Sequence, residues 1–220
     1  MRSIVLLTLV GTLLAAPLAA GQDPAGPKRL MNFADAKVGE LPRGWTAAKT
    51  GTGEGSVWKI VEDKDAPGGP KVLAQTARGP SPLFNLCIAE GTSYADVDLS
   101  VAFKAVAGEI DQGGGLVWRY QDPQNYYVVR QNPLEDNFRV YKVVAGKRVQ
   151  LASDSPEAPA GKWHTIRVVH KGDHIQCYLN GELSLDVKDK ENTFKGPGKV
   201  GLWTKADAQT SFADMKVSGK

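Results

Sequence analysis

Two carboxylic acids, Glu109 and Asp111, stand two residues apart in the stretch EIDQGGG at residues 109–115. Positions i and i+2 of a β-strand point to the same face, so on a strand these two acids would lie side by side. Two carboxyl groups about 5–5.5 Å apart are what a retaining glycosidase uses as nucleophile and acid/base. The stretch, however, runs into three glycines and then into an apolar strand pattern. It is therefore interpreted as a turn that carries solvated acids.

The same two acids match the first part of the E-x-D-x-E or E-x-D-x-x-E strand that glycoside hydrolase family 16 β-glucanases carry. The closing glutamate would fall at position 113 or 114, and both positions are glycine. Glycine has no side chain to move a proton. The sequence therefore argues against that glucanase site.

The three histidines offer another set of candidate acid–base groups. His164 shares one face of an expected strand with Ile166 and Val168, so it is predicted to lie against the core rather than to act in catalysis. His170 and His174 flank a KGD turn and are predicted to form a surface pair, because no third metal ligand is near. No Ser-His-Asp, Cys-His or metal-spacing motif is visible.

Four further acids are candidates for minor roles. Glu135 and Asp136, in NPLEDN, are interpreted as residues of a strand connection. Asp35 and Asp214 could hold a structural calcium where the first and last strands meet, although calcium takes six to eight oxygen ligands. No other cofactor is indicated.

The elements that must position these groups are strands. Period-2 alternation of apolar and polar residues recurs along the chain, whereas a 3.6-residue period is almost absent. Strands are expected at Ser56–Val61, Lys71–Gln75, Asp96–Ala105, Gly114–Tyr120, Tyr126–Asn132, Asn137–Val144, Lys147–Ala152, Trp163–His170, His174–Leu179, Leu183–Val187, Lys199–Thr204 and Ser211–Val217. Asn180-Gly181 predicts a two-residue hairpin turn. The predicted fold class is an all-β, two-sheet antiparallel jelly-roll sandwich.

The N-terminus predicts export. One positive charge, Arg2, is followed by an apolar run that ends in small residues, which is the pattern of a signal peptide cleaved near Ala20. Residues 21–28 are expected to be a flexible lead-in and residues 29–220 a single sandwich domain. The expected location is secreted or periplasmic, with no membrane span after the leader is removed.

Charge and composition exclude some partners. The formal net charge of +3 falls to about +2 when the leader with Arg2 is removed, which is too balanced for a nucleic-acid-binding surface. The two cysteines invite a disulfide in an exported chain. Phe84, Leu86 and Ile88 suggest that Cys87 points away from the apolar face, whereas Cys177 shares a face with apolar neighbours. Two separate thiols are therefore favoured over a Cys87–Cys177 bridge.

One longer segment carries a family resemblance. The stretch GKWHTIRVVHKGDHIQCYLNGELSLDV resembles the laminin-G-like, concanavalin A-like jelly-roll signature, and GGGLVWRYQDPQNYYVVRQN and GKVGLWTKADAQTSFADMKV fit on either side. The match covers roughly residues 95–217. Within that superfamily the chain is most similar to exported bacterial domains grouped with 3-keto-disaccharide hydrolases and loosely called family 16-like.

That resemblance implies a particular chemistry. A ketone at C3 of a sugar acidifies the C2 hydrogen, so a positioned base can drive elimination of the glycosidic oxygen. Active members of the resembling family carry an S-G-x-x-x-R strand and then a Y-E-x-Q-type strand with an acid. GGLVWR places Arg119 on the family's arginine, and YYVVRQN puts Tyr127 where the acid would stand. This departure speaks against catalysis.

Strand parity predicts a surface that could hold a ligand. If β-strands with core-facing Leu116, Val140 and Leu202 share the concave sheet, the alternate side chains face outward on one surface. The predicted ligand-binding residues are Arg119, Tyr127, Arg139, Tyr141, Trp203 and Lys205. Aromatic rings stack on the apolar faces of sugars, and arginines orient hydroxyls or carboxylates.

The sequence therefore predicts an exported domain that binds an oligo- or polysaccharide on its concave sheet. Two alternatives stay open: an active keto-glycoside hydrolase or lyase, and an envelope module that binds another protein.

Overall fold

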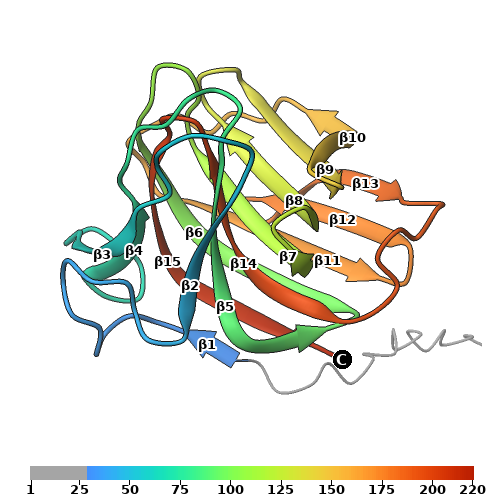
Figure 1. Cartoon of the computed structure of the whole chain (residues 1–220), viewed down its shortest axis with the longest axis horizontal. Coiled ribbons are helices and arrows are strands. Elements are labelled where there is room, and N and C mark those ends of the chain that lie inside the picture. The colour runs from blue at the N-terminus through green and yellow to red at the C-terminus, as the bar shows by residue number, and fades with distance from the viewer. Residues whose placement is uncertain (1–28) are drawn as a thin grey trace, which may run out of the picture.

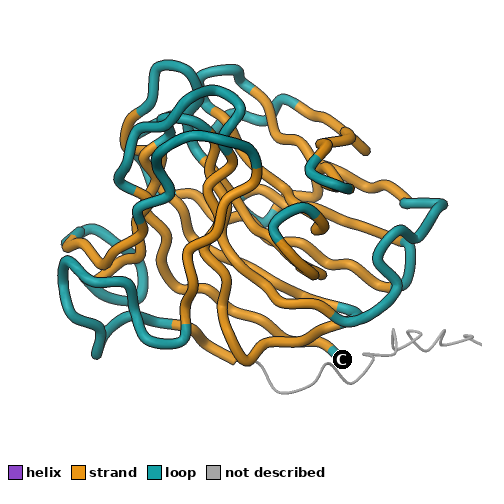
Figure 2. Tube along the Cα trace, viewed as in Figure 1, coloured by secondary structure: helices purple, strands orange, loops and turns teal. Residues whose placement is uncertain are grey.

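The computed structural model describes residues 29–220 (Figure 1). The predicted leader and lead-in, residues 1–28, lie outside the described residues. Strands, turns and loops make up residues 29–220, without a helix among them (Figure 2). Accordingly, this part of the chain has no helix of a length and apolarity that would cross a membrane.

The strands form two sheets. In the eight-stranded sheet the order is β13 (Glu182–Lys188), β12 (His174–Leu179), β11 (His164–Lys171), β6 (Val97–Ala107), β15 (Gln209–Gly219), β4 (Lys71–Gln75) and β3 (Trp58–Glu62), and β1 (Arg29–Met31) pairs with β15. In the seven-stranded sheet the order is β10 (Lys147–Asp154), β9 (Asn137–Val144), β8 (Asn125–Asn132), β7 (Gly114–Asp122), β14 (Gly198–Lys205), β5 (Phe84–Tyr94) and β2 (Trp45–Thr50).

All of these strand pairs are antiparallel. The first and last described strands, β1 and β15, lie side by side, and the C-terminus is close to β1 (Figure 1).

The main hydrophobic core lies between the two sheets. Alternate residues of each strand point inward because side chains of a strand alternate between its faces. The seven-stranded sheet contributes Leu116, Trp118, Val140 and Leu202, and the eight-stranded sheet contributes Leu99, Phe103, Ile166 and Val168. The predicted two-sheet antiparallel sandwich is confirmed.

A second, smaller apolar layer lies on the outer face of the seven-stranded sheet. It contains Leu86, Ile88, Val117, Tyr126, Val128, Tyr141, Val143 and Trp203. The middle strands of this sheet are therefore buried on both faces, which explains why β8 reads as an apolar run, YYVV, rather than as a strict alternation. Side chains on this outer face form the candidate site below.

Strand prediction was correct for the middle and C-terminal parts of the chain and incomplete at the start. The expected strands all correspond to observed ones, with ends shifted by a few residues. Strands β1, β2 and β5 were not expected. Strand β5 has a buried stretch from Leu86 to Ala89 that is apolar on both faces, so its alternation is weak. The Asn180-Gly181 turn has the positive φ values, 52° and 89°, that the predicted hairpin requires.

The two cysteines are free, as favoured from the sequence, but the parity argument for Cys87 was wrong. Cys87 and Cys177 both point into the core between the sheets, one from β5 and one from β12. Leu86 and Ile88 instead face the outer apolar layer. A sheet with two apolar faces does not reveal from sequence which face is the inner one.

Candidate functional site

A row of side chains crosses the outer face of the seven-stranded sheet. Arg139 on β9 is the cross-strand partner of Arg130 on β8, Arg130 is the partner of Gly115 on β7, and Gly115 is the partner of Trp203 on β14. A side chain at Gly115 would collide with the backbone, because its Cβ would lie 1.8 Å from the carbonyl oxygen of Val129. Arg130 and Trp203 are therefore neighbours across a strand position without a side chain.

Three aromatic rings form the apolar base of this region, namely Phe84, Tyr141 and Trp203. The rings of Phe84 and Trp203 are 5.3 Å apart between centroids. The guanidinium of Arg148, from the edge strand β10, lies over all three rings at 4.4 Å from Tyr141, 5.2 Å from Phe84 and 5.9 Å from Trp203. A cation over ring faces is attracted by their negative electrostatic potential, so Arg148 covers the aromatic base.

Charged side chains surround the aromatic base. We call Asp111, Arg130, Glu135, Arg139, Arg148 and Lys205 the polar cluster. Glu135 accepts a hydrogen bond from Nη2 of Arg130 at 2.9 Å and lies 3.7 Å from Nη1 of Arg139. Burial would raise the pKa of Glu135, but the hydrogen bonds from Arg130 and Asn137 outweigh it and lower that pKa to about 2. Glu135 is thus an ionised group that orients two arginines.

Asp111 is the second carboxylate of the polar cluster. Its oxygens accept hydrogen bonds from Nζ of Lys205 at 2.8 Å and from the amide of Asn132 at 3.0 Å. The carbonyl oxygen of the Asn132 side chain accepts the backbone N–H of Glu135, so one asparagine links the two acids. Burial raises the pKa of Asp111, and this outweighs the hydrogen bond from Lys205, which lowers it.

The interpretation of EIDQGGG as a turn with solvated acids was therefore only half correct. Glu109 is solvated, with 84% of its side chain exposed, whereas Asp111 is 1% exposed and paired with Lys205. The reason is that the turn brings Asp111 against Lys205 and Asn132, the last residues of strands β14 and β8.

Several hydrogen-bonding groups of this face have no protein partner within residues 29–220. They include Nε and Nη1 of Arg130, Nη1 of Arg148, Nε1 of Trp203 and the hydroxyl of Tyr141, all of them buried atoms. A buried donor without an acceptor costs about 1–3 kcal/mol. Oxygen-rich molecules could accept hydrogen bonds from these groups. The arrangement is thus suited to holding and orienting a polar ligand.

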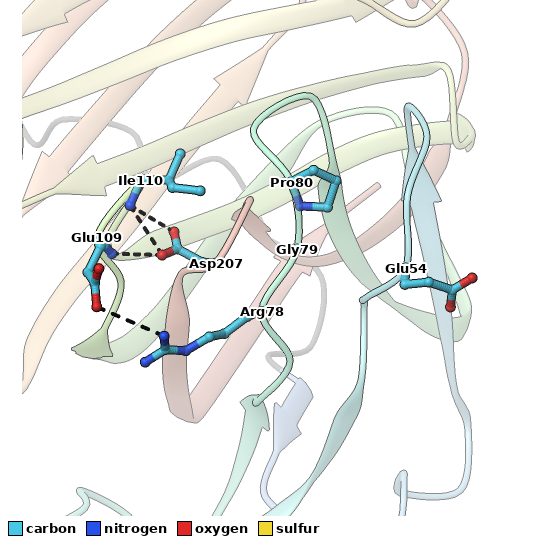
Figure 3. A pocket seen from close by; sticks show the side chains of 7 residues that line it. All are labelled: Glu54, Arg78, Gly79, Pro80, Glu109, Ile110 and Asp207. Carbon is cyan, nitrogen blue, oxygen red and sulfur yellow. Dashed lines mark hydrogen bonds and ion pairs between the residues drawn. The ribbon is translucent and has the colours of Figure 1, made fainter.

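A pocket of about 410 Å³ adjoins the polar cluster at the end of the sandwich (Figure 3). It is lined by Glu54, Arg78, Gly79, Pro80, Glu109, Ile110 and Asp207. The carboxylate of Asp207 accepts the backbone N–H groups of Glu109, Ile110 and Asp111, so it fixes the loop that carries Asp111. Asp207 is a structural residue of this end, and the exposed Glu54, Arg78 and Glu109 bring charged groups to the pocket.

Four of the six predicted ligand-binding residues lie together. Tyr141 and Trp203 belong to the outer apolar layer. Arg139 and Lys205 stand two residues from them on the same strands, so they share this face. Tyr141 and Trp203 are only 3% and 0% exposed, which makes them the base of the region rather than its open surface.

Tyr127 does not lie on this face, contrary to the expectation. Its ring stacks on Trp118 between the sheets, at 5.7 Å between centroids, and its hydroxyl donates to Asp189 at 2.6 Å. The side chains of β8 that point outward are those of Tyr126, Val128 and Arg130. The parity of β8 was assigned one residue out of register, which moves a side chain to the opposite face.

Arg119 is also elsewhere. The backbone there has φ of 45°, and the β7–β8 and β7–β14 registers both shift near this residue, so the strand alternation breaks. The guanidinium donates to the carbonyl oxygens of Phe194 at 3.0 Å and Gly172 at 2.9 Å. Arg119 thus ties loops together at another end of the sandwich.

Sequence reasoning missed Arg130 and Arg148. Arg130 stands two residues before a turn in the YYVVRQN stretch, and correct parity for β8 would have found it. Arg148 follows the AGK turn on an edge strand, where a basic residue is normally solvated. Only the packing of its side chain across β9 onto Tyr141 reveals its position.

The expectation of a surface histidine pair was wrong. His170 is fully buried and accepts a hydrogen bond from Nε1 of Trp118 at 2.8 Å, whereas His174 is partly exposed and bonds to Asp186. His170 points inward because it follows Ile166 and Val168 at even spacing on β11. His164 contacts Phe103, at 5.8 Å between ring centroids, and also bonds to Asn180 at its outer edge.

Asp35 and Asp214 were considered as ligands of a structural calcium. Asp214 pairs with Lys216. Among residues 29–220, no group of three or more His, Cys, Asp or Glu side chains is arranged to hold a metal ion.

Solved structures with this fold include carbohydrate-related domains. The chain is similar to the carbohydrate-binding module CBM66 from Bacillus subtilis, at 19% identity and a TM-score of 0.61 over 79% of this chain and 94% of that chain. It is similar to domain 4 of AbnA, a GH43 extracellular arabinanase from Geobacillus stearothermophilus in complex with arabinotriose, at 12% identity and a TM-score of 0.58 over 90% and 94%.

A third similar structure is the Bacillus licheniformis β-glucanase, at 12% identity and a TM-score of 0.60 over 89% of this chain and 99% of that chain. At these identities the likeness shows the fold alone.

Comparison with curated protein sequences gave no match. A family model described as the 3-keto-alpha-glucoside-1,2-lyase-like domain matches residues 28–218. The match spans both sheets and includes every residue of the polar cluster, and it confirms the resemblance inferred from the sequence. The chain belongs to the family of 3-keto-alpha-glucoside-1,2-lyase-like domains.

Proposed function

We propose that this protein is an exported carbohydrate-binding domain that holds an oligo- or polysaccharide on the outer face of the seven-stranded sheet. The observation that carries this proposal is the set of buried donors without acceptors, on Arg130, Arg148 and Tyr141, beside an aromatic base. Sugars combine hydroxyl oxygens with apolar ring faces, and these buried donors and rings would complement both once Arg148 moves aside.

Arg148 determines how a sugar reaches the aromatic base. Its guanidinium occupies the space over Tyr141, Phe84 and Trp203, so a sugar ring either packs against Arg148 or displaces it. The side chain comes from edge strand β10, where only one neighbouring strand restrains it. Movement of Arg148 would give the sugar both the ring faces and the guanidinium donors.

The comparisons lend support at the level of the fold. One similar structure is a carbohydrate-binding module, and another is a domain in complex with arabinotriose. The proposal includes export to a secreted or periplasmic location through cleavage near Ala20, with residues 29–220 as one domain. This location suits a ligand that is an extracellular or envelope glycan.

Substitution of Arg148 tests the proposal, and the eight-stranded sheet supplies a matched control. On its outer face Arg167 lies over Tyr178, at 5.0 Å from the ring centroid, and also pairs with Asp98, so it is a second arginine over a tyrosine that lies away from the polar cluster. We would record saturation-transfer NMR on the mature domain with neutral and acidic oligosaccharides. Arg148→Ala is expected to weaken binding at least about tenfold, whereas Arg167→Ala leaves it unchanged.

If both variants lose the same amount of binding, or neither loses any, the binding site does not lie at the polar cluster. If the wild-type domain shows no saturation transfer to any of the saccharides, the proposal is overturned and a protein partner is favoured.

A further inference from the structure

The basic side chains of the polar cluster outnumber the acidic ones. The cluster holds four basic side chains, Arg130, Arg139, Arg148 and Lys205, and two acidic ones, Asp111 and Glu135. Lys205 is paired with Asp111, and Glu135 is shared by Arg130 and Arg139. Arg148 contacts the three aromatic rings and has no ion pair within residues 29–220. The cluster therefore carries an excess of positive charge centred on Arg148.

We propose that the saccharide held at the polar cluster is acidic, and that its carboxylate, such as that of a uronic acid, is bound by Arg148 together with Arg130. This inference rests on the proposed function and adds the chemical class of the ligand to it.

Repulsion between the two arginines favours an anion over a neutral hydroxyl. Arg148 lies over Trp203, and only Gly115 separates Arg130 from Trp203 across the sheet, so the two cations share one part of this face. Burial lowers the pKa of Arg148 and the charge of Arg130 adds to this effect, while Tyr141, Asp111 and Glu135 oppose it. Arg130 is 1% exposed and keeps Nε and Nη1 without acceptors. A carboxylate would accept these hydrogen bonds and also neutralise the repulsion, whereas a hydroxyl would only accept the bonds.

The aromatic base distinguishes a sugar acid from a free anion. The hydroxyl of Tyr141 is buried without a partner, and the rings of Phe84 and Trp203 lie beside it under Arg148. A small inorganic or organic anion would engage the guanidinium groups alone. A uronic acid would in addition offer hydroxyls to Tyr141 and an apolar ring face to the aromatic side chains.

The test compares saccharides that differ only in the carboxylate. The probes are oligogalacturonate, the same oligomer after reduction of its carboxyl groups to primary alcohols, and sodium acetate as a free carboxylate. Dissociation constants are measured by isothermal titration calorimetry at low salt and again at higher salt. We expect oligogalacturonate to bind at least about tenfold more tightly than its reduced form or acetate, and to weaken as salt rises.

Two variants assign the effect to Arg148. Arg148→Gln is expected to remove the preference for the acidic oligomer while the unfolding temperature stays near that of the wild type. Lys147→Gln removes the same charge from the neighbouring, exposed position of β10 and is expected to keep the preference.

The outcomes separate this inference from the proposed function. Equal or tighter binding of the reduced oligomer would overturn the acidic ligand and leave carbohydrate binding intact. Acetate binding as tightly as the oligomer would show an anion site that does not recognise sugars, which overturns both. Absence of binding by all three probes would also contradict the acidic ligand, and the wider saccharide panel with Arg148→Ala then decides the proposed function separately.

Discussion

The guanidinium of Arg148 lies 4.4 Å from the centre of the Tyr141 ring, and the two side chains come from adjacent strands, β10 and β9, of the seven-stranded sheet. This contact places a cation on an edge strand over aromatic rings that the middle of the sheet supplies. A molecule that approaches this face therefore meets basic groups first and the aromatic base behind them.

Trp203 and Arg139 should contribute very differently to stability. Trp203 is fully buried, so Trp203→Ala is expected to lower the free energy of unfolding by about 3–5 kcal/mol. Arg139 is partly exposed and makes a long ion pair, so Arg139→Ala should cost less than about 1 kcal/mol. Urea unfolding followed by circular dichroism measures both. Equal costs would mean that Trp203 is not packed as described, and loss of binding in Trp203→Ala is informative only if the variant stays folded.

Glu135 should make the free energy of unfolding fall as the pH is lowered. Burial raises its pKa, the hydrogen bonds from Arg130 and Asn137 lower it more, and the folded pKa of about 2 lies below the ordinary value of 4.5. The unfolded chain therefore binds more protons in this interval, so the contribution of Glu135 is fully present above pH 4.5 and is lost as the pH falls toward 2. Glu135→Gln should flatten the decline of unfolding free energy between these values.

The neighbouring substitution Asp136→Asn serves as the control for Glu135, because it changes the same charge in the same turn. Urea unfolding at several pH values between 3 and 6 compares the two variants. Parallel curves for Glu135→Gln and the wild type would contradict the prediction.

His170 should also make stability depend on pH, over a higher interval that overlaps that of Glu135. Burial, and then the charge of Arg119, lowers the pKa of His170 from 6.5 to about 3. Between these values the unfolded chain holds a proton that the folded chain does not, so the contribution of His170 is fully present above pH 6.5 and is lost as the pH falls toward 3. Thermal unfolding at pH 7 and pH 4 measures this difference.

Replacement of His170 also has a cost at neutral pH. His170→Phe removes the acceptor of the Trp118 N–H and is expected to cost about 1–3 kcal/mol, while it reduces the pH dependence. His164→Phe, at a partly exposed position, is the control. A His170→Phe protein as pH-dependent as the wild type would show that His170 does not cause the effect.

The cysteines should be unreactive until the protein unfolds. Cys87 and Cys177 are free and fully buried, and burial raises the pKa of each thiol, so the nucleophilic thiolate is scarce. We expect a thiol-specific reagent at pH 8 to label neither cysteine in the native protein and both in guanidinium chloride. Labelling of neither under denaturing, non-reducing conditions would instead reveal a disulfide.

The sequence by itself determined the fold and part of the candidate site. Alternating apolar residues and strong turns specify antiparallel strands, and Arg139, Tyr141, Trp203 and Lys205 could be assigned to one face because their strands alternate regularly. The family resemblance was also readable, since its motifs lie in those regular strands. These inferences need only local periodicity.

Only the tertiary structure decided which charged groups complete the site. Tyr127 and Tyr126 are adjacent in an apolar run, and the packing of β8 between two apolar layers determines that Tyr127 points inward. Asp111, Glu135 and Lys205 meet because separate loops fold toward one end of the sheet, and Arg148 reaches Tyr141 by crossing the face from its edge. The Asp111–Lys205 contact joins residues 94 positions apart, and the Arg148–Tyr141 contact depends on how a side chain packs over the sheet, so neither spacing nor composition encodes them. The pKa of Glu135 likewise depends on burial and on hydrogen bonds that exist only in the folded sheet.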